Sequence, residues 1–189
     1  MLAIMLSIEA GAAELGTEQP EHIVLGLAGD AQHALTWRTA PNVLGSVVEL
    51  WPSDAPDTVQ RVVGESEAWS TNLGDMRIHR AQIDGLQPNV TYGYRVGDGS
   101  QERWSSSNQF TAAPAKRNDS VSVLVLSDTQ CHPGRYRVWG ETLYWALADE
   151  HQDDLLVLTG DIVDYGGDQE EWEQWFGAVK NDALGRLPV

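Results

Sequence analysis

The chain has 189 residues, of which 42% are hydrophobic and 21% charged, and these values exclude a chain that is disordered throughout. Asp and Glu number 28 against 12 Lys and Arg, so the formal net charge is −16. Such a surface repels phosphate backbones and argues against nucleic acid as a partner. The single cysteine, Cys131, excludes an internal disulfide.

Residues 1–19 are expected to form a disordered or signal-like N-terminus. The apolar run LAIMLSI has only seven residues and is too short to span a membrane. Together with the small residues AGAA, this run has features of a secretion-signal remnant, but it lacks a basic start and Glu9 interrupts it. A disordered start stays open as the alternative. We expect an extracellular or cell-envelope location.

Residues 20–113 contain short segments in which apolar and polar residues alternate, separated by turn sequences such as PSDAPD and GDGSQ. This spacing predicts an antiparallel β-sandwich, with Trp37 filling the space between its two sheets. The seven expected strands cover residues 21–27, 33–39, 46–52, 58–63, 77–83, 91–96 and 108–113.

The segment LQPNVTYGYRV is typical of a tyrosine corner, in which the hydroxyl of Tyr92 bonds to the backbone upstream. With Trp37 on the second strand, residues 20–113 resemble the fibronectin type III sandwich. The resemblance implies a spacer or docking module, because such domains rarely hold catalytic groups.

Residues 114–120 are expected to be a linker, and the pattern then changes to one typical of α/β proteins. Two continuous apolar runs, VSVLVLS and DLLVLTG, predict parallel strands that are covered on both faces. A helix is expected over 136–150, and a second helix starts at Asp168 as N-cap, with Glu171 completing a capping box. The order predicts a right-handed β-α-β unit, which binds ligands at the carboxyl ends of its strands.

Acidic residues follow both of these strands. The first strand leads to Asp128, and the second leads to Gly160, Asp161 and Asp164. Two carboxylates on neighbouring strands would repel each other unless a cation lies between them, and oxygen ligands suit hard cations. The residues alone leave a second interpretation open, in which both acids merely cap the following helices.

An apolar strand ending in Asp-x-His, followed by Gly-Asp-x-x-Asp after another apolar strand, resembles the opening of the calcineurin-like metallophosphoesterases. A fibronectin-like domain ahead of it resembles the purple acid phosphatases. The resemblance implies a β-sandwich followed by an incomplete α/β metallophosphoesterase domain, here over residues 121–189. It also implies that two divalent metal ions, Mn, Zn or Fe, hydrolyse a phosphate ester. Asp128 would ligate the first metal, Asp161 would bridge both, and Asp164 would support the loop.

The sequence departs from the family pattern at two positions. Gln130 occupies the place of the family's histidine, and His132, two residues later, is a possible substitute, although a histidine that merely lies on a solvated loop is the favoured interpretation. The purple enzymes place a tyrosine ligand where this chain has Asp164, and Tyr165 comes one position later. The sequence therefore predicts no tyrosinate–iron absorption band. A visible band that disappears in Tyr165→Phe would contradict this prediction.

The later family motifs are expected beyond this chain, because it contains no Gly-Asn-His segment and no histidine after Tyr165. We therefore expect an N-terminal part of the enzyme that is inactive alone. Its final residues, LGRLPV, would enter a third strand, and the apolar stripe of Trp172, Trp175 and Phe176 would lack partners. The alternative is a non-catalytic binding or adhesion module with a degenerate α/β remnant.

Overall fold

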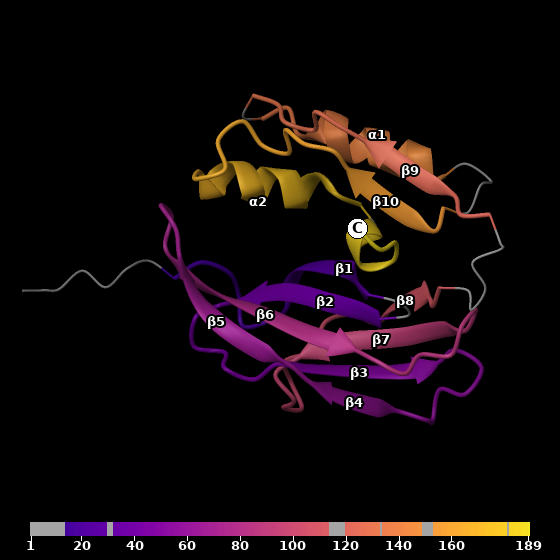
Figure 1. Ribbon diagram of the computed structural model, residues 1–189. Helices are drawn as coiled ribbons and strands as arrows, with labels where there is room; N and C mark the ends of the chain where they lie inside the picture. Colours follow the sequence, from indigo (N-terminus) through magenta and orange to yellow (C-terminus); the bar gives the residue numbers. More distant parts are fainter. Residues whose placement is uncertain (1–13, 30–31, 114–119, 133, 149–152, 181) are drawn as a thin grey trace, which may run out of the picture.

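The computed structural model describes residues 14–29, 32–113, 120–132, 134–148, 153–180 and 182–189. Figure 1 shows two parts: a β-sandwich in indigo to magenta, and a smaller α/β part in orange to yellow. The expected linker and most of the expected N-terminal segment lie outside the described residues. Within residues 14–19, Leu15 donates a backbone hydrogen bond to the Asp75 carbonyl.

The sandwich consists of two four-stranded antiparallel sheets, which confirms the predicted fold class. One sheet has the order β1-β2-β6-β5 and the other the order β4-β3-β7-β8. The strands are β1 (Glu21–Gly29), β2 (Gln32–Thr39), β3 (Val47–Pro52), β4 (Gln60–Val63), β5 (Glu65–Ser70), β6 (Asp75–Ile83), β7 (Thr91–Gly97) and β8 (Asn108–Thr111).

The prediction of seven strands was wrong by one, because β5 was missed. This strand has the sequence ESEAWS, and all of its residues except Ser66 are exposed. A strand at the edge of a sheet needs no apolar face, so alternating hydrophobicity does not reveal it. Trp69, its only large apolar residue, is 52% exposed.

The core of the sandwich contains the two features that the sequence predicted there. Trp37 is 1% exposed and stacks on His79, with 5.1 Å between the ring centroids. The Tyr92 hydroxyl accepts a hydrogen bond of 2.9 Å from the Gln87 backbone N–H, which closes the tyrosine corner. The first contact joins the neighbouring strands β2 and β6 of one sheet, and the second fixes the turn before β7.

The α/β part is built from β9 (Val123–Leu126), α1 (Arg137–Leu147), β10 (Leu155–Leu158), α2 (Gln169–Ala178) and a short 3-10 turn, η1 (Ala183–Gly185). The two strands pair in parallel as predicted, with Leu126 opposite Leu158. Trp139 on α1 stacks on Trp175 of α2, with 5.0 Å between the ring centroids. Among the described residues, no helix is long and apolar enough to cross a membrane.

Two local predictions in this part were wrong. Asp168 does cap α2, by accepting from the Glu170 N–H, but Glu171 does not complete a capping box and bonds elsewhere. The final residues form no strand in the described range. Instead, Leu156 donates to the Pro188 carbonyl and Val189 donates to the Leu25 carbonyl. The C-terminal segment thus lies between β10 and β1 (Figure 1).

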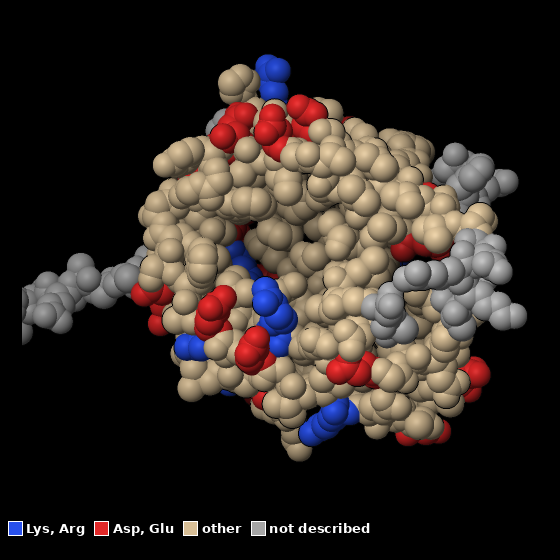
Figure 2. Space-filling model, in the orientation of Figure 1, with Lys and Arg blue, Asp and Glu red and all other residues tan. Residues whose placement is uncertain are grey.

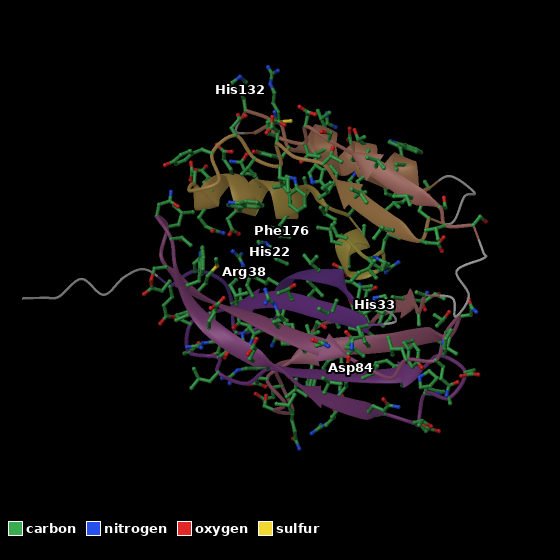
Figure 3. The ribbon with its side chains drawn as sticks, in the orientation of Figure 1. His22, His33, Arg38, Asp84, His132 and Phe176 are labelled. Atoms are coloured by element: carbon green, nitrogen blue, oxygen red, sulfur yellow. The ribbon has the colours of Figure 1, made fainter. Side chains whose placement is uncertain are left out.

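The two parts meet through the C-terminal segment and through α2, and α2 provides partners that the sequence did not predict. His22 of β1 stacks on Phe176, with 4.3 Å between the ring centroids and 13° between the planes. Arg38 of β2 forms ion pairs with Glu173 of α2 and Glu21 of β1. Figure 3 shows His22, Arg38 and Phe176 close together between α2 and the sandwich. The apolar stripe of α2 therefore packs against Trp139 and the sandwich.

One face of the small parallel sheet stays uncovered in the described structure. Val123 is 42% exposed and Val125 is 56% exposed, whereas Leu124 and Leu126 of the same strand pack into the α/β core. Figure 2 shows that the visible face carries acidic side chains at several separate places, including the top of the α/β part. The predicted strands were expected to be covered on both faces, and β9 is covered on one.

Candidate metal site

The two acidic motifs lie next to each other because the backbone pairing of β9 and β10 continues past the ends of the strands. Thr159 donates a hydrogen bond to the Leu126 carbonyl, and Asp128 donates to the Gly160 carbonyl over 3.2 Å. Gln130 then donates to the Asp161 carbonyl over 2.9 Å. Asp128 and Asp161 are therefore carried on adjacent, hydrogen-bonded loops at the carboxyl end of the sheet.

Both aspartates adopt a left-handed backbone conformation. The φ angle is 53° at Asp128 and 44° at Asp161, and Gly160 between β10 and Asp161 has a φ of 139°. A positive φ is uncommon outside glycine, although Asp tolerates it better than most residues. Backbone strain of this kind is typical of ligand-binding and catalytic loops, where the surrounding structure holds it in place.

The interpretation of these acids as helix caps does not agree with the structure. Tyr136 stands at the N-cap position of α1, and Asp168 caps α2. Asp128 and Asp161 are exposed, and within the described part of the chain neither carboxylate forms an ion pair or a side-chain hydrogen bond. Hard cations prefer carboxylate oxygens as ligands, so a cation site at these two loops stays a prediction.

Gln130 and His132 occupy different environments. The side-chain Oε1 of Gln130 is buried and has no hydrogen-bond partner in the described structure, which is unusual for a buried polar atom. Such an oxygen fits a metal site as a neutral ligand. His132 is exposed on the loop between β9 and α1, and Figure 3 shows its side chain at the outer surface.

Asp164 and Tyr165 contribute to the loop through their backbone. Both residues are exposed, and Tyr165 is 70% exposed. Their N–H groups donate to the same carboxylate oxygen of Glu171, over 2.7 and 3.1 Å. Among the described residues, no group of three or more His, Cys, Asp or Glu side chains is close enough to hold a metal ion by itself.

Sequence reasoning missed how Thr129, Glu171 and Tyr136 support these loops. Thr129 donates through its hydroxyl to the Ile162 carbonyl and accepts from the indole N–H of Trp175, so it joins both loops to α2. Glu171 is 6% exposed and also accepts from the hydroxyl of Tyr136. Burial, followed by the hydrogen bond to this carboxylate, raises the pKa of Tyr136 to about 12.

A small cavity of about 110 Å³ lies beside Asp128, between the loop after β9 and helix α1. Its wall is largely apolar and includes Val138, Trp139 and Cys131. Asp128 and Thr129 also line this cavity, so the first acidic motif borders an apolar recess.

Comparisons with known proteins assign both parts of the chain. Residues 20–112 match the purple acid phosphatase N-terminal domain, and residues 121–187 match the calcineurin-like phosphoesterases. Purple acid phosphatase 15 of Arabidopsis thaliana is 27% identical over 171 residues, which cover 76% of this chain and 30% of the relative. The solved structure of purple acid phosphatase PPD1 from yellow lupin (Lupinus luteus) has a TM-score of 0.74 at 18% identity, covering 90% of this chain and 34% of that chain.

The chain thus spans about a third of the length of these two relatives. The structural likeness supports the fold, and the two family matches follow each other in the order that the sequence predicted. By these matches the chain is purple acid phosphatase-like, with the phosphatase N-terminal domain over residues 20–112 ahead of a calcineurin-like phosphoesterase part over residues 121–187.

Proposed function

We propose that this chain provides the first part of a dinuclear metal site that hydrolyses phosphate esters. The observation that carries the proposal is the pair of aspartates, Asp128 and Asp161, at positive φ on hydrogen-bonded loops after adjacent parallel strands. Family membership supports the reaction class, and the uncompensated carboxylates support the cation.

In this proposal Asp128 would ligate the first metal and Asp161 would be a ligand of both. Gln130 is a candidate neutral ligand because its Oε1 is buried without a partner. Asp164 shapes the loop, and His132 and Tyr165 lie at the exposed rim.

The metals would supply Lewis-acid stabilisation and a hydroxide nucleophile for attack on phosphorus. The chain's own residues hold two carboxylates at a fixed separation through the paired loops. Without a cation these negative charges repel a phosphate ester, so substrate binding depends on metal binding. The same proposal includes two domains, residues 20–113 and residues 121–189, and an extracellular or cell-envelope location.

Calorimetry with Mn²⁺ and Zn²⁺ tests the site in the 189-residue chain. We expect weak binding, with a dissociation constant above the micromolar range, because few ligands are present, and we expect it to disappear in Asp161→Ala. Asp57→Ala, at an exposed loop of the sandwich, is the matched control. Equal binding by parent and Asp161→Ala would contradict the assignment.

Hydrolysis of p-nitrophenyl phosphate is expected to be negligible in this chain alone. Turnover above that of Asp161→Ala would contradict the expected inactivity while supporting the site. The alternative function, a non-catalytic binding or adhesion module, is favoured by the lack of a three-ligand group among the described side chains. Absence of Mn²⁺ and Zn²⁺ binding in the parent chain would support that alternative.

A further inference from the structure

The carboxylate of Glu171 receives three hydrogen bonds on one oxygen, Oε2. Two come from the backbone N–H groups of Asp164 and Tyr165, and the third comes from the Tyr136 hydroxyl over 3.1 Å. All three groups donate, so the oxygen acts purely as an acceptor, as a carboxylate does. Hydrogen bonds to an ionised acceptor are about twice as strong as neutral ones.

These three donors belong to two different loops. Tyr136 ends the loop between β9 and α1, which carries Asp128, and it is 2% exposed. Asp164 and Tyr165 lie in the loop between β10 and α2, three and four residues after Asp161. Glu171 itself belongs to the first turn of α2, so one buried side chain joins both acidic loops to a helix.

We propose that Glu171 is a positioning residue that holds the two acidic loops at the spacing needed for a shared metal site. This inference rests on the proposed function for its metal, and on the contacts above for its geometry. The carboxylate does not need to touch the metal. It holds the Asp161 loop by accepting from two backbone N–H groups, which would lose a charge-assisted hydrogen bond without it.

Amide hydrogen exchange measured by NMR tests the contact directly in the metal-free 189-residue chain. In Glu171→Leu we expect exchange at Asp164 and Tyr165 to be faster by about tenfold or more, the ratio for losing a hydrogen bond to a charged group. Glu170→Leu is the matched control, because Glu170 is exposed on the same helical turn. Rates in Glu171→Leu within twofold of those in Glu170→Leu would overturn the inference.

Conservative variants keep the test valid if Glu171→Leu fails to fold. Glu171→Gln retains an acceptor of the same shape and should restore part of the protection. Tyr136→Phe removes only the hydroxyl and should leave both amides protected. We also expect the downfield chemical shift of the Asp164 amide proton to be lost in Glu171→Leu and to be reduced in Glu171→Gln. An unchanged shift in both would overturn the contact.

Mn²⁺ affinity then tests the link to the site. We expect Glu171→Gln to weaken binding severalfold while Glu170→Gln does not. Faster amide exchange with unchanged Mn²⁺ affinity would overturn the positioning role but leave the metal site standing. If the parent chain binds no Mn²⁺, the proposed function fails, and the positioning role fails with it even where the exchange data support the contact.

Discussion

The contact between the two parts of the chain should make the stability of this protein depend on pH through His22. This side chain is 19% exposed and lies between Phe176 and Arg38, with its Nε2 3.8 Å from Glu173. Burial, followed by the positive charge of Arg38, lowers the pKa of His22 from its ordinary 6.5 to about 4, although Glu173 acts in the opposite direction. The imidazole is therefore neutral in the folded protein at pH 5.

The direction in which stability changes with pH follows from this lowered pKa. Between about pH 6.5 and 4 the unfolded chain binds a proton at His22 that the folded chain does not, so stability falls as the pH falls. A shift from 6.5 to about 4 corresponds to at most about 3.5 kcal/mol, at about 1.4 kcal/mol per pKa unit. Partial exposure reduces this to about 2 kcal/mol. The pKa of Glu173 is lowered too, so its contribution is lost only below its ordinary value of 4.5.

The variant His22→Asn removes the titrating group and keeps a residue that tolerates the φ of 51° at this position. Urea unfolding at several pH values from 4 to 8 measures the difference in unfolding free energy between parent and variant. We expect the parent to lose about 2 kcal/mol more than the variant between pH 6.5 and 4, and the two curves to run parallel above pH 7. A difference that stays constant from pH 4 to 8 would refute the reasoning.

Three further substitutions test the packing around the site. In thermal melts, Gly140→Ala should destabilise the chain by about 1–3 kcal/mol, because a Cβ there would collide with the backbone of α2. The control Gly177→Ala should be neutral or stabilising, because a Cβ at Gly177 meets nothing within 4 Å. Thr129→Val should lower the free energy of unfolding in urea by about 1–3 kcal/mol, because it leaves the buried Trp175 indole N–H unpaired. Equal stability of Thr129→Val and Thr129→Ser would contradict this expectation. Asn72→Ala removes two hydrogen bonds to the start of α2, so we expect a loss of about 1–2 kcal/mol, and an unchanged melting temperature would exclude that role.

Local patterns were sufficient for the elements whose neighbours are close in sequence or whose burial is strong. Strands β9 and β10, the buried Trp37 and the corner at Tyr92 were predicted because continuous or alternating hydrophobicity and turn residues are local signals. The family and the fold class followed from the same motifs and are confirmed. The assignment of metal ligands stays a prediction.

The predictions that failed concern residues whose role depends on contacts that hydrophobic periodicity does not encode. Glu171 has the spacing of a capping box, yet it bonds a neighbouring loop and Tyr136. Strand β5 has no apolar face because only its partner β6 holds it in the sheet.

By itself, the sequence determined the order of the two parts, the parallel strand pair and the positions of the two aspartates. Only the tertiary structure decided that α2 packs on His22 and Arg38 of the sandwich, and that Glu171 supports the acidic loops. The physical reason is that hydrophobic periodicity specifies which side of an element is buried but not which surface covers it. A buried polar group bonds whichever donors the packed chain brings within about 3 Å.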